Sequence, residues 1–336
     1  MAPVPERPVL VAPDSFKGTF RAAQVAGAIG RGLERAGLMP PDLCPLADGG
    51  EGTMEALLLA LGGEAVAADV HDPLGRPLRA AFGLVEDGGT AVLEMSAASG
   101  LGLVAEEERD PWAASTRGTG ELICAAVDAG AKVVLLGVGG SATTDGGAGA
   151  LAAIEDRGGL GGAKLVVLTD VRTPFERAPA VFGPQKGADP AMVARLEARL
   201  DALAASLPRD PRGVPMTGAA GGLSGGLWAV HGARLEAGAP FILDALDFDA
   251  RMRAARAVVT GEGKLDEQTL EGKLVGEIGT RTRQAGVPLH AIVGTDALDA
   301  FGKRIIDLQL VQEATDMAEL EAAGEALGRG LAEGRW

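Results

Sequence analysis

Residues 8–19 read PVLVAPDSFKGT, a short apolar run that ends in a polar loop containing glycine. A helical pattern of apolar residues follows this loop and ends at Gly37. The same order recurs at once, because a second apolar run at 42–46 leads into a glycine-rich loop at 47–53 and another helical pattern. This repeat is typical of a parallel sheet that binds ligands at the carboxyl ends of its strands.

The middle of the chain has a different pattern. Turn signals such as Asp72-Pro73-Leu74-Gly75 separate short apolar runs between residues 64 and 95, which predicts antiparallel hairpins. Apolar runs at 255–260 and 289–293 flank a helical pattern, and we expect this βαβ unit to rejoin the N-terminal sheet. The predicted fold class is therefore α/β with two domains: a Rossmann-like parallel three-layer domain from both chain ends, residues 1–66 and 250–336, and an inserted mixed α/β domain, residues 67–249.

Composition excludes several classes of protein. A length of 336 residues suits two domains, and a hydrophobic fraction of 47% argues against disorder. The net charge of −15 disfavours nucleic-acid binding, which needs a basic patch. Two cysteines and three scattered histidines favour neither a disulfide framework nor a zinc site. Without a signal peptide or a long apolar span, we expect a cytoplasmic monomer or homodimer that binds no membrane.

Several loops that follow predicted strands combine glycine, a small hydroxyl residue and a carboxylate. Successive backbone N–H groups in such loops bind anions, and neighbouring carboxylates suit Mg²⁺. Phosphoryl transfer needs these groups together with a base that orients the acceptor hydroxyl. For each loop the alternative is structural, as a helix cap or a tight turn. The clearest examples are residues 14–18, 48–53, 139–149 and 261–273.

The loop at 139–149, GGSATTDGGAG, is the richest of these. It lacks the lysine of a Walker A loop and the spaced glycines of a dinucleotide-binding fingerprint. We favour contact with phosphate or a nucleotide over a glycine-rich packing turn.

Taken together in their order along the chain, these motifs resemble those of the bacterial type I glycerate kinase family. The resemblance covers about residues 9–294 and includes APDSFKGT (12–19), PLADGGEGT (45–53), GVGGSATTDGGAGAL (137–151), VFGPQKGA (181–188) and TGEGKLDEQTLEGK (260–273). It implies ATP-dependent phosphorylation of D-glycerate, most often to 2-phosphoglycerate, with Mg²⁺ and in a cleft between two α/β domains.

From these loops and the resemblance together, we assign roles to individual residues as a hypothesis. Asp48 or Asp170 would accept the glycerate hydroxyl proton or hold magnesium. The catalytic lysine would be Lys17, which together with Lys186 would counter negative charge on glycerate or the transferred phosphoryl group. The glycine-rich loops at 139–147 and 261–263 would hold the nucleotide phosphates. Asp145 and Asp266 are further candidates for magnesium. The predicted substrate and cofactor contacts are Asp14, Ser15, Gly49, Gly50, Glu51, Gly139, Gly140, Ser141, Gln185, Lys186, Gly261, Glu262 and Gly263.

Two stretches depart from the family pattern. Ala150–Lys164 is short where family members carry an additional strand and loop, and Thr173 stands where the family tends to have asparagine. Two alternatives therefore stay open: a kinase for another small hydroxy acid, and a non-catalytic relative that binds a metabolite. The acids at 14, 48, 145, 170 and 266 favour the kinase, because a binding protein has less need of them.

Overall fold

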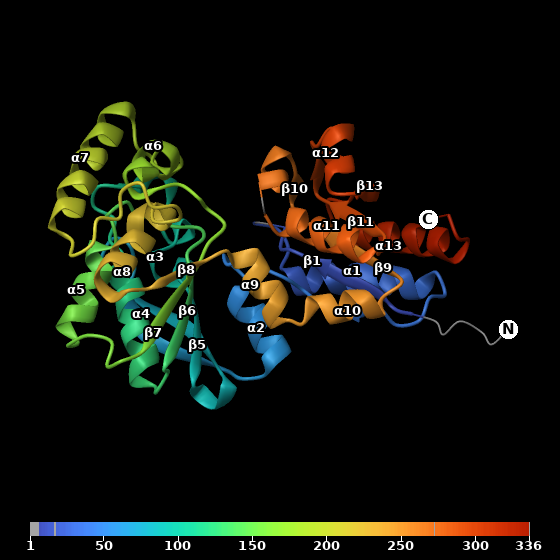
Figure 1. The fold of residues 1–336 in the computed structure, drawn as a ribbon, viewed down its shortest axis with the longest axis horizontal. Helices are drawn as coiled ribbons and strands as arrows, with labels where there is room; N and C mark the ends of the chain where they lie inside the picture. The colour runs from blue at the N-terminus through green and yellow to red at the C-terminus, as the bar shows by residue number, and fades with distance from the viewer. Residues whose placement is uncertain (1–6, 17, 272, 336) are drawn as a thin grey trace. The chain divides into compact units, whose positions relative to one another are not determined.

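The computed structural model describes residues 7–16, 18–271 and 273–335 (Figure 1). The chain forms two compact units. The terminal unit combines the residues up to Asp48 with those from Ala239 on, and the inserted unit is Gly49–Gly238. The chain thus passes from one unit to the other after Asp48 and after Gly238. The predicted domain boundaries lie farther along the chain, after residues 66 and 249.

The terminal unit contains a five-stranded parallel sheet in the order β13-β11-β9-β1-β2. Its strands are β1 (Val9–Pro13), β2 (Asp42–Leu43), β9 (Ala257–Gly261), β11 (Leu289–Val293) and β13 (Leu308–Glu313). Strand β1 pairs with β9 along its whole length, which confirms that both chain ends build one sheet. From β1 the chain continues to β2 on one side, whereas β9, β11 and β13 lie on the other, so the strand order switches between β1 and β9.

Helices cover both faces of this sheet, as a three-layer domain requires. Helices α1 (Ala22–Arg35) and α13 (Met317–Ala332) pack with β1 and β9 in one core. A Cβ on Gly32 of α1 would lie 2.1 Å from the carbonyl oxygen of Glu321, so glycine lets these two helices approach closely. Helix α11 (Leu274–Ala285) contributes to a second core with β11. The remaining elements are α9 (Gly238–Ala245), α10 (Phe248–Ala254), α12 (Ala300–Ile305) and a two-stranded sheet of β10 (Lys264–Leu265) and β12 (Thr295–Asp296).

The inserted unit contains a six-stranded mixed sheet in the order β3-β4-β5-β6-β7-β8. Its first three strands are antiparallel neighbours, which confirms the hairpins predicted between residues 64 and 95. The later strands are parallel. The strands are β3 (Glu64–His71), β4 (Pro77–Val85), β5 (Thr90–Glu94), β6 (Val133–Gly137), β7 (Lys164–Leu168) and β8 (Arg234–Glu236).

Seven α-helices are described in the inserted unit: α2 (Thr53–Leu61), α3 (Ser96–Ser99), α4 (Arg117–Asp128), α5 (Ala148–Asp156), α6 (Ala178–Phe182), α7 (Pro190–Ser206) and α8 (Leu223–His231). Helix α2 packs on β4 and β5, so it belongs to this unit although it follows β2 of the other. The short stretch 150–164 still contains most of α5 and reaches β7, which completes a β6-α5-β7 crossover. Asp189 caps α7, since its Oδ1 accepts the Met192 N–H at 2.7 Å.

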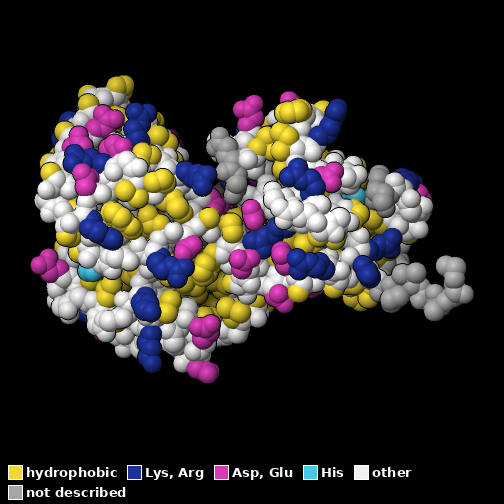
Figure 2. Space-filling view, in the orientation of Figure 1, with side chains coloured by type: hydrophobic (Ala, Val, Ile, Leu, Met, Phe, Trp, Pro, Cys, Tyr) yellow, Lys and Arg dark blue, Asp and Glu magenta, His cyan; other side chains and the backbone are white. Residues whose placement is uncertain are grey.

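On the face seen in Figure 2, acidic and basic side chains are interspersed. None of the helices in the described part of the chain is both long and apolar enough to cross a membrane.

Candidate functional site

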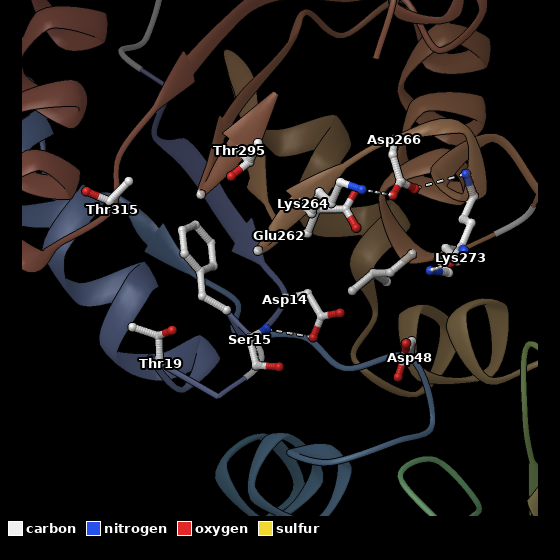
Figure 3. Close-up of a pocket in the computed structure, with 15 residues that line it drawn as sticks. Asp14, Ser15, Thr19, Asp48, Glu262, Lys264, Asp266, Lys273, Thr295 and Thr315 are labelled. Atoms are coloured by element: carbon white, nitrogen blue, oxygen red, sulfur yellow. Dashed lines mark hydrogen bonds and ion pairs between the residues drawn. The ribbon is translucent and has the colours of Figure 1, made fainter. Parts of the chain in front are cut away.

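A cavity of about 500 Å³ opens in the terminal unit at the carboxyl ends of β1 and β9, where the strand order switches (Figure 3). Open α/β sheets bind their ligands in this position, because the loops that follow the two strands diverge there. The lining residues come from the loops after β1, β2, β9, β10, β11 and β13, from β10 and β12 themselves and from the start of α11: Asp14, Ser15, Phe16, Thr19, Asp48, Glu262, Gly263, Lys264, Asp266, Gln268, Lys273, Leu274, Gly294, Thr295 and Thr315.

The loop after β1 holds Asp14 in a fixed position. The Asp14 N–H donates to the carbonyl oxygen of Gly261 at 2.8 Å, which ties this loop to the end of β9. Its Oδ1 accepts the Ser15 N–H at 2.6 Å, and only 7% of the residue is exposed. Phe16 is buried beneath the loop, where its backbone pairs with Phe20. Lys17, a predicted catalytic residue, lies outside the described residues.

The loop after β9 positions two more acids through one buried threonine. The Thr269 hydroxyl donates to Oε1 of Glu262 at 2.8 Å and accepts the Asp266 N–H at 3.2 Å. Lys264 lies with its Nζ 3.1 Å from Oδ2 of Asp266. This ammonium holds the pKa of the Asp266 carboxyl below its usual range, and the Gln268 N–H that Asp266 also accepts adds to the effect.

A second lysine stands at the start of α11. Lys273 donates from its Nζ to Oε1 of Gln268 at 2.7 Å, and both residues line the pocket. Figure 3 shows Lys264 and Asp266 above the cavity and Asp14 and Asp48 below it. The described lining thus carries carboxylates and ammonium groups together, which suits a ligand that has both a cation and an anion.

The carboxylates of the pocket have the oxygen donors that a magnesium ion would use. Mg²⁺ prefers oxygen ligands and is usually held by one or two carboxylates together with substrate phosphates. Among the described residues, no three His, Cys, Asp or Glu side chains form a cluster that would hold a metal by themselves. The carboxylate oxygens of Asp14, Asp48, Glu262 and Asp266 are donors of the kind that Mg²⁺ prefers, and an ion held by one or two of them would need further oxygen ligands from a substrate.

The glycine-rich loops of the inserted unit pack directly on one another. A Cβ on Gly137 would lie 2.4 Å from the carbonyl oxygen of Gly49, and one on Gly139 would lie 2.8 Å from Cα of Gly50. Side chains at these positions would force the two backbones apart. The glycines predicted as ligand contacts at 49, 50 and 139 thus have a packing role of their own, while Gly140 and Glu51 are exposed.

Lys186 is buried in the inserted unit and joins two of its loops by hydrogen bonds. Only 1% of the residue is exposed, and its Nζ donates to Oγ of Ser141 at 2.8 Å and to the carbonyl oxygen of Thr143 at 2.5 Å. Burial lowers the pKa of the ammonium to about 7, against the opposing effect of the Asp145 carboxylate. Its neighbour Gln185 is exposed.

Asp145 is a second buried residue that joins separate segments of the inserted unit by hydrogen bonds. It is 2% exposed, and its carboxylate accepts hydrogen bonds from the N–H groups of Thr116, Gly147 and Gly149 and from the Thr116 hydroxyl, at 2.8 to 3.1 Å. These bonds join the start of α4 to the start of α5. Asp170, the other acid predicted here, is half-buried just beyond β7.

The pocket brings together Asp14, Ser15, Asp48, Glu262, Gly263 and Asp266, with Gly261 at the end of β9 beside them. The other described candidates belong to the inserted unit, and their proposed roles stay predictions. The sequence reasoning did not single out Lys264 and Lys273, although both lie inside the quoted motif at 260–273. It also missed Glu94, whose Oε1 accepts the N–H groups of Gly52 and Met54 at 3.0 and 2.8 Å.

Comparison with known proteins gives a consistent result over nearly the whole chain. The model of the glycerate kinase family matches residues 9–159 and 155–327. The two matched stretches overlap at residues 155–159, at the end of α5. The glycerate kinase of Bacillus subtilis (strain 168) is 40% identical over 332 residues, which cover 87% of this chain and 86% of that protein. The glycerate 2-kinase of Escherichia coli (strain K12) is 37% identical over 326 residues, with 85% of each chain covered.

A solved structure is also similar. The crystal structure of the "putative glycerate kinase 2" of Salmonella typhimurium LT2 superposes with a TM-score of 0.82 at 33% sequence identity. The match covers 98% of this chain and 99% of that one. The two-domain α/β architecture is therefore shared as a whole.

Proposed function

The chain belongs to the glycerate kinase family, and on this basis we propose that it transfers a phosphoryl group from ATP to D-glycerate in the presence of Mg²⁺. The observation that carries the proposal is the pocket at the strand-order switch. Acids from three separate motifs that resemble the family converge there, namely Asp14, Asp48 and the pair Glu262 and Asp266. Phosphoryl transfer needs such a combination of carboxylates with positively charged groups.

The proposed product is 2-phosphoglycerate. Support comes from the relative named glycerate 2-kinase, which is similar to this chain over 85% of its length. In the proposed reaction the hydroxyl oxygen on carbon 2 of glycerate forms a bond to the γ-phosphorus of ATP. The bond from that phosphorus to the bridging oxygen of ADP breaks, and the hydroxyl proton passes to a carboxylate.

We assign this proton acceptor to Asp48 or Asp170. Asp48 lines the pocket, and Asp170 follows a parallel strand of the inserted unit. Asp266 is a stronger candidate for magnesium than Asp145, because the Asp145 carboxylate already accepts four hydrogen bonds from the protein. Bound magnesium would neutralise charge on the phosphate oxygens.

A coupled assay of ADP release tests the proposal, with ATP, magnesium and a panel of hydroxy acids. We expect turnover that depends on D-glycerate. Asp48→Asn and Asp170→Asn should each lower turnover by about 100-fold or more, the range of general-base catalysis, with an unchanged unfolding midpoint. Near-normal turnover in both variants would remove this assignment, and preference for another acid would change the substrate.

A further inference from the structure

We propose that the pocket of the terminal unit is the nucleotide subsite, where Lys264 and Lys273 bind the phosphate oxygens of the nucleotide. This inference rests on the proposed kinase function and names which of the two substrates the pocket takes. It also assigns a binding role to two residues that the motif reasoning did not single out.

The position and size of the pocket favour a nucleotide over glycerate. Loops after β1 and β9 form it at the point where the strand order switches, and doubly wound sheets bind nucleotides in this crevice. Its volume of about 500 Å³ lies within the range of pockets for drug-sized ligands. A three-carbon acid would leave most of that space empty.

The lysines are placed to meet phosphate. Lys273 has an uncharged partner, the side-chain oxygen of Gln268, and it forms no ion pair among the described residues. It also precedes the first turn of α11, where the helix dipole favours an anion. The Lys264 side chain is 61% exposed and is paired with Asp266 alone, so it remains accessible to a ligand. The charge of Lys273 acts on the Asp266 carboxylate, and a phosphate oxygen would give this ammonium an anion in direct contact.

The acids of the pocket argue against a bare carboxylate as the occupant. Asp14, Asp48, Glu262 and Asp266 outnumber the two described lysines of the lining. The glycerate carboxylate brings no cation to offset them, so the proposed approach of glycerate to Asp48 is through its uncharged hydroxyl group. A nucleotide that carries magnesium brings a cation for the carboxylates and phosphate oxygens for the lysines.

Residues 266–269, between the two lysines, are held by hydrogen bonds of their own. Thr269 joins Glu262 to Asp266, and Gln268 is held by Asp266 while it accepts from Lys273. The ammonium groups are thus positioned before a ligand arrives. Binding therefore loses less side-chain conformational entropy.

The test is calorimetric titration of magnesium ADP into the full-length protein, with separate measurement of the KM values for ATP and D-glycerate. We expect Lys273→Gln to weaken magnesium ADP binding by about tenfold or more and Lys264→Gln to weaken it by a smaller factor. Lys273→Arg should restore part of the affinity. The control is Lys164→Gln, an exposed lysine of the inserted unit, which should bind as the wild type does.

The outcomes separate this inference from the kinase proposal. Suppose that the wild-type protein binds magnesium ADP through these lysines but shows no turnover with any hydroxy acid. This result would support the nucleotide subsite and contradict the proposed kinase activity. If the wild type turns over glycerate and the lysine variants change only the KM for glycerate, the kinase stands and the subsite is wrong. Unaltered magnesium ADP affinity in both glutamine variants, confirmed as folded by thermal unfolding, would also overturn it.

Discussion

The terminal and inserted units carry loops of the same composition but use them differently. In the terminal unit the acids that follow β1 and β9 line an open cavity, and Asp266 meets a lysine that is mostly exposed. In the inserted unit Asp145 and Lys186 are buried and bind the loops around them. The charged residues of the terminal unit thus line a cavity, whereas those of the inserted unit hydrogen-bond to the surrounding loops and stabilise the fold.

This difference teaches that glycine beside an acid does not by itself mark a ligand site. In the loops that contain Gly49 and Gly139, the missing side chains let two backbones pack at contact distance. Whether such a loop binds ligand or braces the fold depends on where its polar atoms find partners.

The buried acid of the inserted unit should matter most for stability. Asp145→Ala should lower the free energy of unfolding by about 3 kcal/mol or more, because several buried donors lose a charged acceptor at once. Asp266→Ala is the matched control in the terminal unit and should cost less, about 1 kcal/mol, since this carboxylate accepts one backbone N–H and pairs with a largely exposed lysine. Urea unfolding measures both. An Asp145→Ala protein of normal stability that has lost its magnesium dependence would instead make Asp145 a metal ligand.

Lys186 should make stability depend on pH. The unfolded chain keeps this proton up to the usual pKa of 10.5, whereas the folded protein releases it near 7. Unfolded chains therefore hold more protons between these values, and the free energy of unfolding gains up to about 1.4 kcal/mol per pH unit as pH rises. Lys186→Met should lack this gain in urea unfolding from pH 7 to 10. The same slope in both proteins would show that the ammonium is not held in an unfavourable environment.

Glu94 should act through its hydrogen bonds rather than its charge. Burial raises the pKa of this carboxyl, while its Oε1 accepts the N–H groups at the start of α2. Glu94→Ala should cost about 1–2 kcal/mol of stability at pH 7, and Glu94→Gln should cost much less because the amide oxygen still accepts. Thermal unfolding compares the two. Equal losses would show that the negative charge is what matters.

The smallest change in stability is expected at the pocket. Lys264→Gln should alter the free energy of unfolding by no more than about 0.5 kcal/mol, because the Lys264 side chain is largely exposed to solvent. Chemical unfolding of the variant beside the wild type measures this. A large loss of unfolding free energy would mean that Lys264 stabilises the terminal unit, as Lys186 is expected to stabilise the inserted unit.

Much of the architecture follows from the sequence. The apolar runs that became β1, β9 and β11 are bounded by polar, glycine-bearing loops, and the turn signals between residues 64 and 95 indicate hairpins. Strand β13 was not predicted, because its residues are only partly buried and lack a clear apolar pattern. Local sequence also does not reveal that α2 packs on the sheet of the inserted unit, since that depends on distant strands.

The site could be predicted only in part. Acids placed directly after parallel strands pointed to Asp14, Asp48 and Asp266, because such strand ends share one edge of a sheet. Burial is not visible in a sequence, so the internal role of Lys186 could not be foreseen from its glycine-rich surroundings. Lys17 lies outside the described residues, and its catalytic role stays a prediction.

The most direct test of the central claim is phosphorus NMR of the products from ATP, magnesium and D-glycerate with the wild-type protein. The account predicts ADP together with a new phosphomonoester signal that is split into a doublet, since carbon 2 of glycerate bears a single proton. A triplet would instead place the phosphate on carbon 3. If folded protein yields no new phosphomonoester, the claim that this chain phosphorylates glycerate is contradicted.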